Sequence, residues 1–112
     1  MASLDASLSP YMELKDLEAK MHDFVASKGW YDADSPKAQT PRNLAASLAI
    51  EAAEVLEHFQ WREEVADKDA LAGELADVAL YLLQLASIAG IDLETAVLDK
   101  LALNETREWP AP

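Results

Sequence analysis

The sequence has no cysteine, only three glycines, and nine Lys and Arg side chains against 21 Asp and Glu. Without cysteine there is no disulfide framework, no thiolate nucleophile and no zinc–cysteine site. The glycines stand apart at positions 29, 73 and 90, so the chain has no phosphate-binding P-loop. A formal charge of −12 argues against binding to nucleic acid polymers or to anionic membranes, since both require a basic surface.

Signals for export and membrane insertion are also missing. Met1–Pro10 has neither a basic region nor an apolar stretch of the kind found in signal peptides. The longest apolar stretch, Val78–Ile91, contains polar residues and is shorter than a bilayer span. We therefore expect a small, soluble, acidic protein of the cytoplasm, a compartment compatible with the lack of cysteine. Residues 1–112 are expected to form one domain, with flexible ends at 1–9 and 110–112.

Leucine dominates the apolar residues, with 17 copies against eight for valine and isoleucine together. This ratio favours helices, because β-branched side chains lose rotamer freedom there. Apolar residues recur at three- and four-residue spacing in four segments, about Pro10–Lys28, Arg42–Trp61, Asp69–Ala89 and Asp92–Thr106. Ser9 and Asp92 are expected N-caps, and Gly29 and Gly90 are expected to end helices. With no convincing strand pattern, the predicted fold is all-α, a four-helix bundle.

The third segment is apolar on more than one side. Its main apolar stripe consists of Leu71, Leu75, Val78, Leu82 and Leu85. Beside this stripe, Leu80, Leu83 and Ala86 form a second apolar face. A helix that is apolar on most sides needs burial on most sides. Either it lies at the centre of a monomer or a second chain covers it. We favour the second chain, and thus a homo-oligomer.

The connection Gly29–Thr40 is rich in turn-forming residues and long for a link between two helices. A lid over a functional site and a disordered insertion are equally compatible with it.

Two pairs of carboxylates stand out within the predicted helices. Glu51 and Glu54 are three residues apart, as are Glu74 and Asp77, so each pair lies on one helix face. The first row continues through His58 to Trp61 and the second through Tyr81 to Gln84, although His58 alone is more typical of a partly exposed helix residue. The short connection Arg62–Lys68 favours antiparallel packing, in which the two rows face each other.

Four carboxylates gathered in a partly buried place repel one another and resist desolvation. They need a counter-charge, and oxygen ligands suit Mg²⁺, with Mn²⁺ as a second possibility. Solvated surface acids are the simpler explanation, but two paired motifs on consecutive helices favour the metal site.

Other catalytic arrangements find no support in the sequence. There is no Ser or Cys triad, two histidines cannot form a three-histidine zinc site, and no Glu-x-x-His pair suggests a di-iron bundle. A cation held by carboxylates typically acts on a phosphate ester or polyphosphate. Lys100, Asn104 and Arg107, at i, i+4 and i+7, could neutralise phosphate oxygens. The more common role of such residues is to interact with the dipole at a helix C-terminus.

These residues resemble the MazG-like, all-α nucleoside triphosphate pyrophosphohydrolases, and are most similar to the dCTP pyrophosphatase branch. The resemblance is carried by Pro41–Leu44, Ser47–Glu54 and Phe59–Trp61, by Glu74–Val78 with Tyr81, and by Lys100–Arg107 followed by Trp109-Pro110. It covers most of residues 24–110, and the ordered set of motifs is quite specific.

The resemblance implies hydrolysis of a nucleoside triphosphate to the monophosphate and pyrophosphate, with a dNTP such as dCTP preferred and pool cleansing as the role. It implies Mg²⁺ held by Glu51, Glu54, Glu74 and Asp77, and assembly as a dimer or a dimer of dimers. Further residues implied are the phosphate contacts Lys100, Asn104 and Arg107 and the base-stacking Trp30, Trp61 and Tyr81. As a mechanism we expect Glu51 or Glu54 to accept a proton from the attacking water and Lys100 to stabilise the developing charge.

The sequence departs from the family pattern around the expected base pocket. Met21, with His22 beside it, and Gln39-Thr40 stand where relatives often carry histidine, and the loop after Trp30 is longer. The ending Trp109-Pro110 has tryptophan where tyrosine is more typical. These departures bear on base preference more than on the chemistry.

Two alternatives remain open from the sequence. The same bundle could act on another phosphate compound, such as a phosphoribosyl-ATP-like substrate, although the aromatic set favours a free nucleotide. A non-catalytic acidic module that binds a protein partner would also fit the composition.

Overall fold

The structure, a computed structural model, describes residues 12–110. Within this range it consists of helices without strands, so the predicted all-α class is confirmed. The helices are α1 (Leu14–Ser27), α2 (Pro41–Glu57), α3 (Lys68–Ile88) and α4 (Leu93–Thr106). The predicted cap Ser9, the helix start at Pro10 and the flexible ends lie outside the described residues, apart from Pro110.

The first helix begins later than the sequence analysis expected. Met12 and Glu13 are not helical, and α1 starts at Leu14. The reason is a capping box in which Glu13 is the N-cap and its backbone N–H donates to Asp16 Oδ2 at 2.9 Å. Gly29, with φ +74°, ends α1 as predicted.

The second helix also differs at one end. Thr40 caps it by accepting a hydrogen bond from the Asn43 backbone N–H at 3.2 Å, and Pro41 occupies the first position. The helix ends at Glu57 rather than at the predicted Trp61, and residues 58–61 form turns.

The remaining helix ends follow the sequence signals within one residue. Asp67 and Asp92 cap α3 and α4 by accepting from the backbone N–H groups of Ala70 and Thr95 at 3.0 and 3.1 Å. Gly90, with φ +75°, follows the end of α3.

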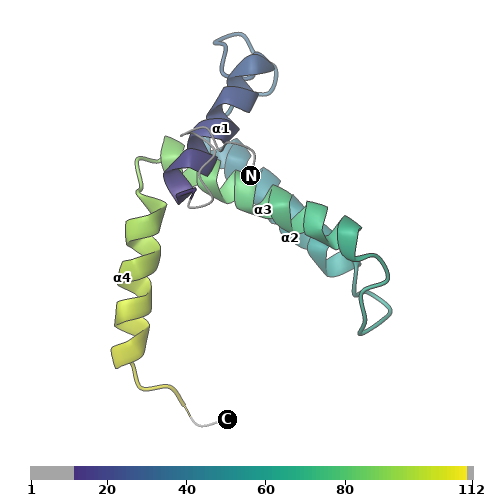
Figure 1. Cartoon of the computed structure of the whole chain (residues 1–112). Coiled ribbons are helices and arrows are strands. Elements are labelled where there is room, and N and C mark those ends of the chain that lie inside the picture. Colours follow the sequence, from purple (N-terminus) through teal and green to yellow (C-terminus); the bar gives the residue numbers. More distant parts are fainter. Residues whose placement is uncertain (1–11, 111–112) are drawn as a thin grey trace, which may run out of the picture.

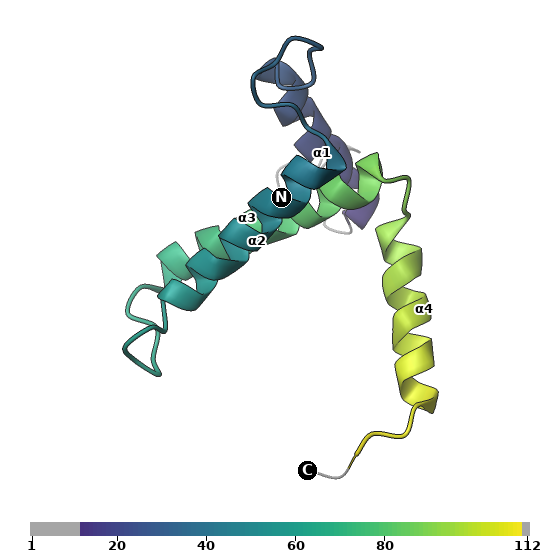
Figure 2. The same cartoon turned by 180° about the vertical axis from the view of Figure 1, so that it is seen from behind.

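Helix α3 is the centre of the molecule (Figure 1). Helix α2 lies antiparallel beside it along most of its length, α1 packs against its C-terminal half, and α4 meets it only near their junction before pointing away; the view from behind in Figure 2 shows the same arrangement. Antiparallel packing of α2 and α3 agrees with the prediction from their short connection.

The small core lies where α1 crosses α3. Met21, Val25 and Leu83 form its buried cluster, and Leu14, Trp30 and Leu93 pack against them. On α3, Leu83 and Ala86 of the second apolar face are buried, whereas Leu80 of the same face is 43% exposed. The predicted main stripe is covered only in part: Leu75 is 50% and Leu82 41% exposed, and its other members, Leu71, Val78 and Leu85, are half-buried.

By length and composition alone, α3 is apolar enough to cross a bilayer, with a mean hydropathy of 1.4 over 18 residues. The sequence estimate of a run too short to span took only Val78–Ile91 into account, whereas the helix begins at Lys68. Core helices of bundles have the same character. In the single chain 17% of that window is buried, and α3 packs against α1 and α2.

Candidate active site

Three of the predicted metal ligands converge between α2 and α3. Glu51, Glu54 and Glu74 are half-buried, and one carboxylate oxygen from each lies within 4.8 Å of the others. The spacing of three residues places Glu51 and Glu54 on one face of α2, and the antiparallel packing brings that face to Glu74 on α3.

Asp77, the fourth predicted ligand, lies beside this cluster rather than in it. It is exposed and follows Glu74 by three residues on α3. Its charge helps to raise the pKa of Glu51 and of Glu74, so it belongs to the same electrostatic neighbourhood.

Burial and the crowding of carboxyl groups in this cluster raise the pKa values of Glu51 and Glu74. Burial raises the pKa of the Glu51 carboxyl to about 7, with further increases from the nearby carboxylates of Glu54, Asp77 and Glu74. The pKa of Glu74 is raised first by the adjoining Glu54 carboxyl and then by burial, while His58 opposes the shift. Concentrated negative charge in a partly desolvated place is thus the main electrostatic feature of the site.

Two oxygens of the cluster have no partner in the described part of the chain. Glu51 Oε2 and Glu74 Oε2 are buried and accept no hydrogen bond. A buried acceptor without a donor is costly, and an ionised carboxylate more so. A divalent cation would satisfy both oxygens and offset the repulsion, and oxygen ligands are those that hard cations prefer. The residues present therefore fit a divalent metal.

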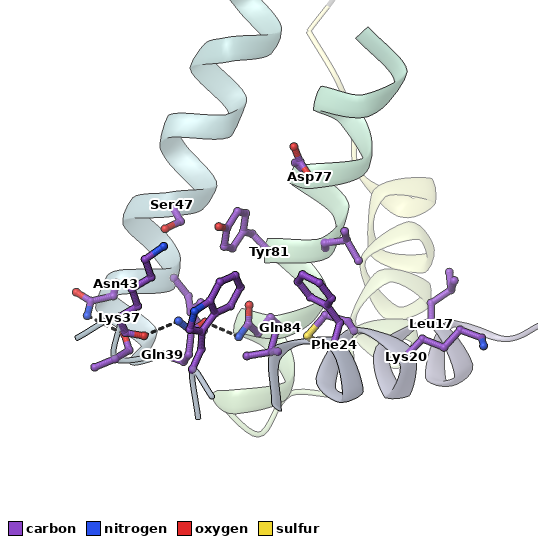
Figure 3. Close-up of a pocket in the computed structure, with 16 residues that line it drawn as sticks. Leu17, Lys20, Phe24, Lys37, Gln39, Asn43, Ser47, Asp77, Tyr81 and Gln84 are labelled. Carbon is purple, nitrogen blue, oxygen red and sulfur yellow. Dashed lines mark hydrogen bonds between the residues drawn. The ribbon is translucent and has the colours of Figure 1, made fainter. Parts of the chain in front are cut away.

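A cavity of about 660 Å³ opens next to the carboxylates. Asp77 and Ser47 lie at its carboxylate end, and its walls come from α1, the loop before α2, the first turns of α2 and the second half of α3 (Figure 3). The size and the predominantly apolar lining are those of a pocket for a small organic ligand.

Aromatic side chains form part of these walls. Trp30 and Tyr81, both predicted to stack on a base, line the cavity together with Phe24. Phe24 packs edge-on against Trp30 with ring centroids 5.8 Å apart, and the Lys37 ammonium lies 5.2 Å from the centroid of the Trp30 ring. This cation–π contact brings a positive charge to the cavity.

Amide side chains form the opposite end. Gln84, only 3% exposed, donates from Nε2 to Gln39 Oε1 at 2.8 Å and to the Tyr31 hydroxyl at 3.3 Å. Gln39 donates from Nε2 to the Lys37 carbonyl at 2.6 Å. These hydrogen bonds attach the loop before α2 to α3, and the loop forms one wall of the cavity.

Several predicted site residues lie away from this cavity in the same chain. Trp61 is 88% exposed in the turn after α2, at the end of the α2–α3 pair remote from α1 (Figure 1). Lys100, Asn104 and Arg107 are on α4, which diverges from the other helices, and none of them lines the cavity. Arg107 stacks instead on Trp109, its guanidinium carbon 4.1 Å from the ring centroid, and Asn104 Oδ1 is buried without a hydrogen-bond partner among the described residues.

Sequence reasoning missed most of the polar residues around the cavity. Lys37 and Gln39 belong to a loop, where no periodicity shows which side chains point inward. Gln84 did appear as the last member of the row that begins at Glu74, and a glutamine within an otherwise apolar helical segment was the available signal.

Comparisons with known proteins agree on one family. A family model described as MazG-like matches residues 46–111. Human dCTP pyrophosphatase 1 is 34% identical, over 94% of this chain and 64% of its own length. A dATP/dGTP diphosphohydrolase of Salmonella phage PMBT28 is 50% identical over 43% of this chain and 18% of its own. The chain thus spans less than two thirds of the length of these relatives.

A solved structure extends the similarity to the fold. The crystal structure of a pyrophosphatase from Archaeoglobus fulgidus superimposes with a TM-score of 0.69 and 35% sequence identity. The superposition covers 90% of this chain and 95% of the archaeal one. Both chains therefore have the same arrangement of helices over nearly their whole lengths.

Proposed function

Because the chain belongs to the MazG-like family, we propose that it hydrolyses (deoxy)nucleoside triphosphates to the monophosphate and pyrophosphate. The observation that carries this proposal is the convergence of Glu51, Glu54 and Glu74, one helical turn from Ser47 and Asp77, which line a cavity with aromatic walls. The names of relatives that act on dCTP, dATP and dGTP support a dNTP as substrate. Removal of unwanted nucleotides from the cytoplasmic pool is the role that such a reaction suits.

The metal in this proposal is Mg²⁺, with Mn²⁺ as the second choice, held by Glu51, Glu54 and Glu74 with Asp77 nearby. Support comes from the two unpartnered carboxylate oxygens and from the preference of hard cations for oxygen ligands. When bound, the metal supplies Lewis-acid chemistry, neutralising phosphate charge and acidifying the attacking water.

The protein's own groups have distinct tasks in the reaction. One of the two α2 carboxylates, Glu51 or Glu54, accepts the proton of the attacking water. Water attacks phosphorus at the α–β bridge, so that pyrophosphate leaves. Trp30 and Tyr81 hold the base in the cavity, while Trp61 lies outside it.

Helix α4 provides the proposed phosphate contacts, Lys100, Asn104 and Arg107, with Lys100 stabilising the developing charge. These residues do not reach the cavity of their own chain, so in this proposal they act in a homo-oligomer, where α4 packs on a second copy. The exposed leucines of α3 and α4 support such an assembly.

The test is pyrophosphate release from a panel of dNTPs and NTPs, with Mg²⁺ and with EDTA, for the wild type and for Glu54→Gln. Glu54 is the carboxylate that adjoins both Glu51 and Glu74, and the amide keeps its size while removing its charge. We expect Mg²⁺-dependent release by the wild type and a loss of about 100-fold or more in the variant.

The matched control is Glu57→Gln, an exposed acid one turn further along α2, which should keep full activity. Full activity in a well-folded Glu54→Gln protein would remove the carboxylate cluster from the mechanism. Release from no nucleotide at all would favour a phosphoribosyl-ATP-like substrate or a non-catalytic role instead.

A further inference from the structure

Gln84 lies at the end of the cavity remote from the carboxylates, enclosed between the loop before α2 and helix α1. Its side-chain amide has two faces of opposite chemistry, a donating NH₂ and an accepting oxygen. The protein groups that bind one of these faces decide which face is left for a ligand in the cavity.

The first constraint comes from the loop. The Lys37 backbone carbonyl can only accept, so the Gln39 group at 2.6 Å from it is the donating Nε2. Gln39 therefore turns its Oε1 toward Gln84, at 2.8 Å. An oxygen that only accepts requires a donor opposite it, and Gln84 must present its Nε2 there.

The second constraint comes from Tyr31, in the turn after α1. Its hydroxyl oxygen accepts from Gln84 Nε2 at 3.3 Å. The same oxygen lies 2.5 Å from His22 Nδ1, and His22 Nε2 lies 2.7 Å from Ser87 Oγ, so the hydroxyl is held in place by a hydrogen-bonded chain from α1 to α3. Burial raises the pKa of Tyr31, and the hydrogen bond from Gln84 opposes the shift.

Both protons of the Gln84 NH₂ group are thus used within the protein. The remaining Oε1 has no hydrogen-bond donor among residues 12–110, and in Figure 3 it points to the side of the cavity where Tyr81 lies. Gln84 therefore offers the ligand an acceptor whose orientation is set from two sides.

The position of Gln84 suits the base of a nucleotide. Asp77 and Gln84 are seven residues apart on α3, about 10 Å along the helix axis. Trp30 and Tyr81 line the cavity, and Figure 3 shows Tyr81 between Asp77 and Gln84. A nucleotide with its phosphates at the carboxylates would place its base between these rings, with its outer edge at Gln84.

We propose that Gln84 is a specificity-determining residue that selects bases with an amino group at position 4 of a pyrimidine or position 6 of a purine. The amino group donates to Oε1, whereas an oxo group would place two acceptors against each other in a desolvated pocket. This inference rests on the proposed function and names the substrate class of the same site.

The test compares dCTP with dUTP, which differ in the amino or oxo substituent at position 4 and in the matching protonation of N3. For the wild type we expect kcat/KM to favour dCTP by about 10- to 100-fold, since a site built for a hydrogen bond rejects an analogue that lacks it. In Gln84→Met, which keeps the length of the side chain without the acceptor, the ratio should approach one through a loss with dCTP. If the enzyme prefers purines, dATP and dITP provide the same comparison.

A second pair of variants tests the orientation of the amide without changing Gln84. Gln39→Leu removes the acceptor that holds Nε2, so the amide can rotate and the ratio should fall toward one. Gln39→Glu loses the donor to the Lys37 carbonyl but keeps an oxygen facing Nε2, so it should retain more of the ratio than Gln39→Leu. A merely structural role for Gln39 would lower kcat/KM for both substrates in parallel and leave the ratio unchanged.

The outcomes separate this inference from the function on which it rests. An active wild type with a ratio near one, or an unchanged ratio in folded Gln84→Met, overturns the role of Gln84. If Gln84→Met does not fold, the half-buried loop position Gln39 carries the test, and an unchanged ratio in Gln39→Leu overturns the inference. Absence of hydrolysis of every nucleotide contradicts the proposed function instead.

Discussion

Glu51 shows how one residue combines the stability and the chemistry of the site. Its carboxyl lies between helices that bury it and beside three other acids, and these surroundings raise its pKa to about 7. The same features that prepare it to exchange a proton near neutral pH make its ionised form unfavourable in the folded protein without metal.

This shift predicts a pH dependence of stability. The folded Glu51 carboxyl binds its proton more tightly than the unfolded one, whose pKa is about 4.5. Its stabilising contribution is therefore fully present below about pH 4.5 and is lost as the pH rises through about 7. In thermal unfolding with EDTA, we expect Tm to fall from pH 5 to pH 7.5, and to fall less in Glu51→Gln.

Two comparisons make this prediction specific. Glu57→Gln, outside the cluster, should show the pH dependence of the wild type, and Mg²⁺ at pH 7.5 should raise Tm in the wild type more than in Glu51→Gln. Equal pH dependence in all three proteins would mean that Glu51 is not the group that titrates.

Residues of the site could be predicted from sequence where their neighbours are close along the chain. The spacing within α2 and α3 and the short connection between them were enough to bring Glu51 and Glu54 to Glu74. Trp61 continues the helical row of Glu51 and Glu54 in the sequence, and the family resemblance implied that it stacks on the base, but α2 ends at Glu57 and the row with it. The hydrogen bonds of Gln84 depend on a loop whose conformation has no periodic signal.

At the scale of the elements, local signals decided where helices begin and end. Asp92 was predicted as the cap of α4, because a cap acts within three residues, whereas Asp67, the cap of α3, was not singled out and the helix begins one residue before the expected Asp69. The direction of α4 is set by the turn after α3, where Gly90 has φ +75°. The left-handed region is open to glycine, tolerated by asparagine and unfavourable for other residues.

Gly90→Ala should therefore destabilise the protein by about 1 kcal/mol, through the backbone alone. A Cβ at this position would meet no atom within 4 Å, so steric overlap does not contribute. Gly90→Asn should cost less than Gly90→Ala, because asparagine accepts this conformation more readily. Chemical denaturation of the three proteins measures the difference, and equal losses for Ala and Asn would show that backbone strain is not the cause.

At the scale of the whole molecule, the distribution of apolar surface does not match that of a complete globular unit. The described part of α4 has no buried residue, and Val97, Leu98, Leu101 and Leu103 are each about half exposed or more. On α3, Leu75 is 50% and Leu82 41% exposed. Apolar surface of this extent is typical of an interface, and in our proposal a second copy of the chain covers it.

We expect light scattering during gel filtration to give two or four times the chain mass of 12.3 kDa. Leu98→Glu tests whether α4 forms the interface, because Leu98 is 59% exposed in the single chain, where a charge would cost little. In an apolar interface the same charge would be desolvated without a partner. The variant should thus shift toward the monomer and lose activity, because in the proposed assembly Lys100 and Asn104 act at the site of a neighbouring copy. Leu98→Met should keep both mass and activity. A wild type that is active as a monomer would contradict the role of the second copy, and a fully assembled Leu98→Glu would place the interface elsewhere.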